Sequence, residues 1–169
     1  MSRAGMLAIR PLRPGETEIV GSVFDRLGPL SRVLRFGGAK ATLSESELDA
    51  LADVGERRHA VVAFLAGDWA PAGIARFVVD ADDRSIAEIA IAVVDEHQGR
   101  GIGKALMRAL VADARAMGVE RLRATIAGEN RRSLALLRTV ATLEDVRFDG
   151  GSIEVLASIP SRGSVLRAA

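Results

Sequence analysis

The sequence contains no cysteine and no tyrosine, and aromatic residues make up only 4% of its 169 residues. Without cysteine the chain has no disulfide framework, no thiol nucleophile and no thiolate metal ligand. Without tyrosine, a common general acid is missing from any mechanism that the chain could use. The scarcity of aromatic side chains and the net charge of +1 argue against nucleic-acid binding, which uses cationic surfaces and stacking rings.

Long apolar runs are also missing. No stretch approaches the roughly 20 apolar residues of a membrane span, and the first sixteen residues lack the apolar region of a signal peptide. We therefore expect no membrane association and a cytoplasmic location. The length and the 49% hydrophobic content suit one domain over residues 1–169, with a short frayed tail from about residue 160. The sequence gives no indication of the oligomeric state.

Apolar periodicity along the chain predicts an α/β protein in which strands and helices alternate. Three consecutive strands before the central glycines form an antiparallel meander, and the strand, helix and strand that follow form a right-handed parallel crossover. A hairpin ends the pattern. The expected strands are 7–10, 59–65, 73–79, 85–94, 121–126, 146–148 and 153–155, and the expected helices are 16–27, 30–36, 45–54, 102–117 and 130–139.

The most informative stretch runs from Glu88 to Lys104. An apolar strand leads into three glycines at alternate positions, 99, 101 and 103, which are interleaved with Arg100 and followed by Lys104 at the start of a long amphipathic helix. A helix N-terminus offers unpaired amides and a partial positive charge, and glycine lets a phosphate approach those amides. Arg100 and Lys104 add cations at the same place. The pattern predicts a loop that binds a phosphate-sized anion.

Two familiar nucleotide loops do not match this stretch. A P-loop needs glycine at position 98 and serine or threonine after Lys104, where the chain has Gln98 and Ala105. A dinucleotide fingerprint needs glycine at position 104 or 106, where the chain has lysine and leucine. A tight strand-to-helix turn with solvated basic residues remains an alternative, but three glycines cost backbone entropy that one turn glycine would not.

The motif Gln98-x-x-Gly101-x-Gly103, after a strand and before a helix, resembles that of the GCN5-related N-acetyltransferases. Over residues 7–157 the resemblance implies a mixed sheet that splays open beside the central strand, with flanking helices. It also implies that loop amides hold the pyrophosphate of acetyl-CoA and that the central strand edge and a downstream asparagine contact the pantetheine arm. The residues assigned to acetyl-CoA in this way are Ile91, Ala92, Val93, Gln98, Gly99, Arg100, Gly101, Ile102, Gly103, Lys104 and Asn130.

Glu88 is the candidate general base. A lysine amine with a pKa of about 10.4 is protonated at neutral pH, so attack on a thioester needs a base. Glu88 is the only charged residue in the apolar run 86–94, where a carboxylate is expensive without partners or a function. Ala90 and Ala92 share its strand face and leave room beside it, and its distance of about 15 Å from Val93 suits action through a water molecule. The alternative is a surface carboxylate paired with Arg76.

One departure from the family pattern affects the mechanism. Many relatives carry a tyrosine seven residues after the matched asparagine, followed later by Gly-Phe, and here those positions hold Leu137, Ala141 and Thr142. We therefore assign no general acid, and a catalytically silent acyl-CoA-binding domain is an alternative function.

The order of motifs in the first half resembles bacterial Pat-type protein lysine acetyltransferases. This resemblance implies a protein lysine as the acceptor, with a small-molecule amine as the alternative. No metal is expected, since the aspartates at 80, 82 and 83 have the spacing of solvated turns rather than of an oxygen cage. We interpret His97 and His59 as structural residues. Trp69 is expected at a hairpin tip, where it either packs on the surface or touches substrate.

Overall fold

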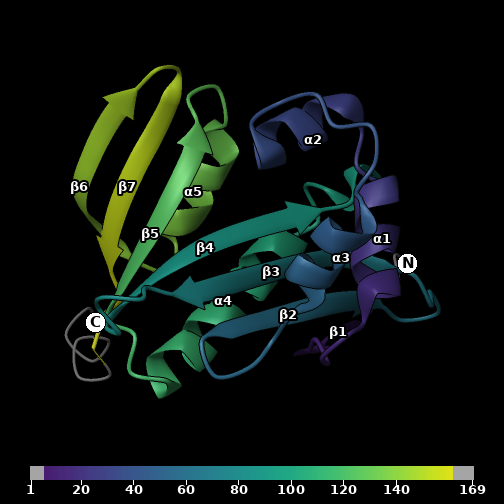
Figure 1. Cartoon of the computed structure of the whole chain (residues 1–169), viewed down its shortest axis with the longest axis horizontal. Coiled ribbons are helices and arrows are strands. Elements are labelled where there is room, and N and C mark those ends of the chain that lie inside the picture. The colour runs from purple at the N-terminus through teal and green to yellow at the C-terminus, as the bar shows by residue number, and fades with distance from the viewer. Residues whose placement is uncertain (1–5, 162–169) are drawn as a thin grey trace.

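The computed structural model describes residues 6–161, and its centre is a mixed sheet of seven strands. Neighbouring strands are antiparallel except for β4 and β5, which are parallel. The expected meander and crossover are both present (Figure 1). In sheet order, the strands are β1 (Leu7–Pro11), β2 (Arg58–Leu65), β3 (Pro71–Val79), β4 (Ile86–Val93), β5 (Arg121–Ala127), β7 (Ser152–Ser158) and β6 (Thr142–Asp149).

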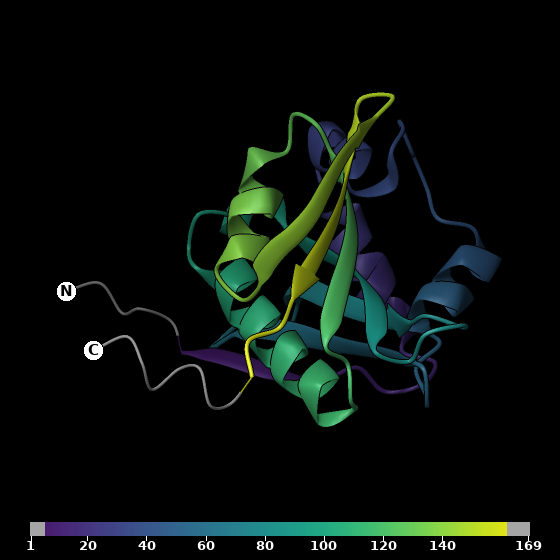
Figure 2. The same cartoon turned by 90° about the vertical axis from the view of Figure 1, so that its left-hand side faces the viewer.

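Helices cover both faces of the sheet (Figures 1 and 2). On one face α1 (Thr17–Asp25) packs against β3 and α3 (Glu45–Ala52) packs against α1, while α2 (Pro29–Phe36) contacts both β4 and β5. On the other face α4 (Ile102–Ala116) packs against β2, β3 and β4, and α5 (Arg131–Arg138) packs against α4. The apolar face of α4, which its three-and-four spacing predicts, is buried in the main core.

The sheet splays open between β4 and β5. These strands pair only over Ile86–Glu88 and Arg121–Arg123, and afterwards they diverge, as Figure 1 shows. Because β5 pairs with β7 along its whole length, it turns away from β4 together with the second half of the sheet. Within the described residues, the edge of β4 from Ile89 to Val93 that faces β5 has no strand partner. The splayed sheet expected from the family resemblance is therefore present.

Strand β4 is less buried than its apolar sequence suggests. Only Ala87 is fully buried, Glu88 is exposed, and the remaining residues are half-buried. The reason is the splay, which leaves one edge of the strand open. An apolar run of this kind predicts a buried strand, and that prediction is wrong here.

Strand β6 begins at Thr142, four residues before the expected start at Val146. It is an edge strand whose side chains are nearly all exposed, so its first half has no apolar alternation that could reveal it. The expected frayed tail falls mainly on 162–169, outside the described residues. Within residues 6–161, no helix combines the length and the apolar character that a membrane crossing requires.

Candidate active site

The glycine loop lies at the wide end of the splay, where β4 ends and α4 begins. Gly99 and Gly101 have left-handed backbone conformations, with φ of +75° and +82°, which other residues rarely adopt. A Cβ atom added to either glycine would meet nothing within 4 Å. The two glycines therefore set the path of the loop and also leave open space above its amides.

Gly103 serves the packing of the first helical turn. A Cβ atom at this position would lie 3.3 Å from Leu136 Cδ2 and 3.7 Å from Val93 Cγ2. Its missing side chain lets the start of α4 approach α5 and β4 closely. The sequence predicted one role for all three glycines, and it missed this packing contribution because Leu136 lies far away in the chain.

The N-terminus of α4 has the properties of an anion site. No side chain caps it, and no acidic residue lies in its first turn. The amide of Ala105 donates to the Gly101 carbonyl at 3.1 Å, whereas the amides of the first turn have no acceptor within the helix. Arg100 and Lys104 are exposed beside these amides. The loop thus presents free amides, two cations and open space, which fit the pyrophosphate of acetyl-CoA.

Gln98 ties this loop to its surroundings. Its Nε2 donates to the Val93 carbonyl at 3.0 Å and to Ser31 Oγ on α2 at 3.2 Å. The sequence predicted that Gln98 and Val93 contact the cofactor, which remains a prediction, and the structure shows that they also contact each other. Gln98 therefore holds the loop at the end of β4, and the Val93 carbonyl already has one donor.

His97 packs in the turn before the loop, as expected, and its side chain is 13% exposed. Its Nδ1 accepts a hydrogen bond from Arg100 Nη1 at 3.0 Å. Its Nε2 lies 3.8 Å from an Asp68 carboxylate oxygen and 3.9 Å from a Glu96 carboxylate oxygen. Hydrogen-bonding to Arg26 is the main cause that lowers the pKa of Glu96. This ionic cluster fixes the ring, and the ring in turn positions the Arg100 guanidinium.

Asn130 caps α5, and its Oδ1 accepts from the Ser133 amide at 3.1 Å. The helix expected over residues 130–139 is present, with Asn130 as its cap, and the contact with pantetheine remains a prediction. Seven residues later, Leu137 is 2% exposed in the core. The position at which many relatives carry a tyrosine therefore offers no proton donor.

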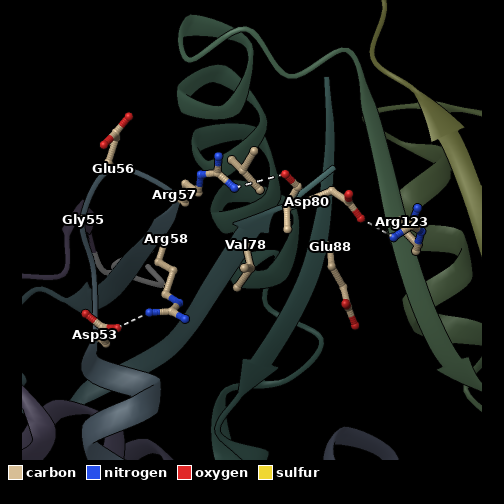
Figure 3. Close-up of a pocket in the computed structure, with 11 residues that line it drawn as sticks. Asp53, Gly55, Glu56, Arg57, Arg58, Val78, Asp80, Glu88 and Arg123 are labelled. Atoms are coloured by element: carbon tan, nitrogen blue, oxygen red, sulfur yellow. Dashed lines mark hydrogen bonds and ion pairs between the residues drawn. The ribbon is translucent and has the colours of Figure 1, made fainter. Parts of the chain in front are cut away.

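Glu88 lines a cavity of about 500 Å³ near the narrow end of the splay (Figure 3). Arg58 pairs with Asp53, Arg84 pairs with Glu56, and Arg57 donates to the Ala81 carbonyl. The remaining charged pair, Arg123 with Asp80, is joined at 2.9 Å. Among the charged side chains of the described residues that line this cavity, Glu88 alone has no ion pair or hydrogen bond.

The Glu88 side chain extends away from the Asp80–Arg123 pair in Figure 3. The sequence predicted that the Glu88 carboxylate lies in an apolar strand, where burial would be costly. In the structure this carboxylate is exposed to solvent, so burial does not set it apart from other carboxylates. The alternative was correct that Glu88 faces the surface, but within residues 6–161 Glu88 has no ion pair with Arg76. Glu88 is a free, accessible carboxylate with Ala90 and Ala92 on its strand face.

The aspartate-rich turn before β4 is built on local hydrogen bonds. Asp80 Oδ1 accepts from the amides of Asp82 and Asp83, and the first of these bonds is the main cause that lowers the pKa of Asp80, followed by Arg123. These aspartates cap their own turn, as expected. The described residues contain no group of His, Cys, Asp and Glu that could hold a metal ion.

His59 and Trp69 differ in their packing, and a contact of Trp69 with substrate remains a prediction. His59 Nε2 is 2.7 Å from Asp113 Oδ2 and the ring packs against Phe77, so His59 joins β2 to α4. Trp69 lies between β2 and β3 and is 97% exposed, so it packs on nothing.

The open strand edge, the uncapped loop beyond it and the free carboxylate on the same strand match the arrangement that the family resemblance implies. Comparison with known protein families identifies the family of this chain. Residues 33–140 match the family described as Acetyltransferase (GNAT) family, and the chain belongs to it. Its class is therefore that of an N-acetyltransferase that uses acetyl-CoA.

Individual relatives agree with this assignment. The chain is 33% identical over 155 residues to the acetyltransferase Pat of Mycolicibacterium smegmatis, covering 90% of this chain and 45% of that protein. It is 31% identical over 128 residues to the acetyltransferase PA5475 of Pseudomonas aeruginosa, covering 73% and 67%. The crystal structure of the GNAT domain of S. lividans PAT has a TM-score of 0.79 at 20% identity, covering 94% and 99%. The chain thus spans less than half of the Mycolicibacterium relative.

Proposed function

We propose that this chain transfers the acetyl group of acetyl-CoA to the side-chain amine of a protein lysine, with Glu88 as the general base. The observation that carries the proposal is the free carboxylate of Glu88, which lines a cavity beside the splay while each other charged side chain that lines this cavity has an ion pair or a hydrogen bond. A general base must be accessible to the proton that it removes, and Glu88 is.

The reaction is a direct attack. The neutral amine nitrogen bonds to the thioester carbonyl carbon, and the bond between that carbon and sulfur breaks. The amine proton passes to Glu88, directly or through one water molecule, and the coenzyme leaves as a thiolate. Because Leu137 stands where a tyrosine acid would be and the chain has no tyrosine, solvent protonates the thiolate. The loop amides with Arg100 and Lys104 hold the pyrophosphate of the donor.

Two observations support a protein acceptor. The cavity at Glu88 is open and lined by charges of both signs, which suits a lysine presented on a protein surface. The second observation is similarity to the acetyltransferase Pat. The motifs in the first half of the chain also resemble those of Pat-type protein lysine acetyltransferases.

The test is to incubate the full chain with acetyl-CoA and a mixture of bacterial proteins and to map acetyllysine by mass spectrometry. We expect lysine sites that depend on the enzyme and are lost with Glu88→Gln. The matched control is Glu154→Gln, which removes an exposed carboxylate from β7 and leaves these sites unchanged. Turnover of small amines without modification of any protein lysine would contradict the protein acceptor.

A further inference from the structure

A second, narrow cavity of about 30 Å³ lies on the face of β4 that carries Glu88. Its walls are mostly apolar side chains, which come from α1, α2, α3, the segments between them, and β3, and Ala90 and Ala92 of β4 also line it. Two charged side chains line the same cavity. Arg35 comes from the last turn of α2, and Arg76 comes from β3, directly opposite Ala90 in the strand register.

Neither of these two guanidinium groups has a carboxylate partner in the described part of the chain. Arg35 has one close contact, with the ring of Phe36 at 4.8 Å. Both side chains are half-buried. The arginines that do form ion pairs are elsewhere, at Arg10, Arg26, Arg58, Arg84, Arg123 and Arg147.

The surroundings disfavour two unpaired cations. Burial, reinforced by the charge of Arg76, lowers the pKa of Arg35 to about 10, and the Glu88 carboxylate only partly opposes this. Burial is also the main cause that lowers the pKa of Arg76. Half-buried charges without partners are unfavourable, so a bound anion would relieve this arrangement.

We propose that Arg35 and Arg76 bind a carboxylate of the acceptor, close to the amine that is acetylated. This inference rests on the proposed function, because it places the amine at Glu88. Glu88 lies opposite Val78 and Arg76 lies opposite Ala90, so the two positions are one two-residue step apart, roughly 7 Å along the strand. The planar fork of a guanidinium matches the two oxygens of a carboxylate.

The carboxylate can come from an acidic side chain beside the target lysine or from the α-carboxylate of a free amino acid. Both sources supply the same chemistry, and kinetics can separate them. In the first arm, the full chain acetylates two peptides that differ only in carrying Glu or Gln next to the single lysine. In the second arm, a free amino acid is compared with its α-amide.

We expect at least a tenfold higher kcat/KM for the carboxylate form in one of the two arms, and that arm identifies the source. Arg35→Gln and Arg76→Gln each reduce this preference to less than threefold, mainly by slowing the carboxylate form. The control Arg147→Gln, on the distant edge strand β6, keeps the full preference. Because neither arginine has a carboxylate partner in the described residues, the Gln variants are expected to keep the thermal midpoint.

Three results would overturn the inference. The first is equal rates for both members of both pairs in an active enzyme. The second is an equal loss of rate on both members of a pair in the arginine variants, which indicates a structural role. The third is that the arginine variants lose transfer from succinyl-CoA but not from acetyl-CoA. This result would mean that the two arginines bind a carboxylate of the acyl donor and not one of the acceptor. If no amine is acetylated at all, the proposed function itself fails, and acetyl-CoA binding measured on the same sample distinguishes that case.

Discussion

At the scale of single residues, the site depends on which charges are paired. The cavity at Glu88 contains several carboxylates and guanidinium groups, yet ion pairs and turn hydrogen bonds occupy all of them except Glu88. In the glycine loop, pairing also fixes the position of a charged side chain. His97 accepts from Arg100 and is itself fixed by neighbouring carboxylates, so a cation beside the free amides is held in a defined place.

His97→Leu tests this positioning of Arg100. Removing the Nδ1 acceptor frees the Arg100 side chain, which then loses conformational entropy when it binds the pyrophosphate. We expect KM for acetyl-CoA to rise several-fold with kcat nearly unchanged, and the combination with Arg100→Gln to add little further effect. A fall in kcat with an unchanged KM would instead assign His97 to the chemical step.

At the scale of elements, the strand, loop and helix that we propose as the donor site depend on backbone conformation. Gly101 begins α4 in the left-handed region, and the sheet and helix on either side fix the position of this turn. On the other face of the sheet, α3 is held by a complete capping box. The Ser44 side chain accepts from the Glu47 amide, and the Glu47 side chain accepts from the Ser44 amide.

Gly101→Ala measures the backbone requirement of the loop. A non-glycine residue in the left-handed region costs roughly 1–2 kcal/mol, and we expect a loss of that size in the free energy of unfolding from urea titration. Affinity for acetyl-CoA should fall at the same time. The control is Gly38→Ala, where φ is not positive and a Cβ atom meets nothing within 4 Å, so stability is expected to be unchanged or slightly higher.

The capping box of α3 predicts a specific pH dependence of stability. The hydrogen bond from Lys40, followed by that from the Ser44 amide, lowers the pKa of Glu47 to about 2. A lowered folded-state pKa means that the contribution is complete above the ordinary value near 4.5 and is lost as the pH falls toward 2. Thermal melts between pH 5 and pH 2 should therefore fall less steeply for Glu47→Gln than for the unaltered chain. Identical slopes would contradict the assigned pKa.

At the scale of the whole molecule, the splay separates two functions. In the proposed function, the loop at the carboxyl end of β4 holds the donor, while the face of β4 with Glu88 and the two-arginine cavity holds the acceptor. Strand β4 connects them, since its open edge lies toward β5 and its Glu88 face lies toward α2. This arrangement allows donor binding to be measured without any acceptor.

Donor binding should stabilise the whole fold. A ligand at 100 times its dissociation constant adds about 2.7 kcal/mol, and each kcal/mol raises the melting temperature of a chain of this size by roughly 2–4 °C. We expect acetyl-CoA to raise the melting temperature by about 5–10 °C under these conditions and Lys104→Met to reduce the shift. An unchanged melting temperature at millimolar acetyl-CoA would contradict the assigned donor site.

Local patterns predicted the donor half of the site more fully than the acceptor half. The glycine spacing, the helix of α4 and the cap at Asn130 are each encoded within a few residues, and all three are present. The open edge of β4 follows from the divergence of β4 from β5, and β5 is fixed by its pairing with β7. The exposure of Glu88, which lies in the paired segment of β4, is indicated by no local pattern.

Long-range packing accounts for the other differences. The packing role of Gly103 depends on Leu136 of α5, 33 positions later in the sequence. The meeting of Arg35 and Arg76 depends on how α2 lies over the sheet, and no pattern near either residue indicates it. The early start of β6 was missed because an exposed edge strand needs no apolar alternation.

The most direct test of the account compares binding and turnover in one variant. Glu88→Gln is titrated with acetyl-CoA by calorimetry, and its thiol release is followed with an acceptor peptide. We predict that the Kd for acetyl-CoA stays unchanged while the turnover rate falls by roughly a hundredfold or more, as expected for the loss of a general base. Glu88→Gln that keeps most of its turnover would contradict the assignment of Glu88 as the base.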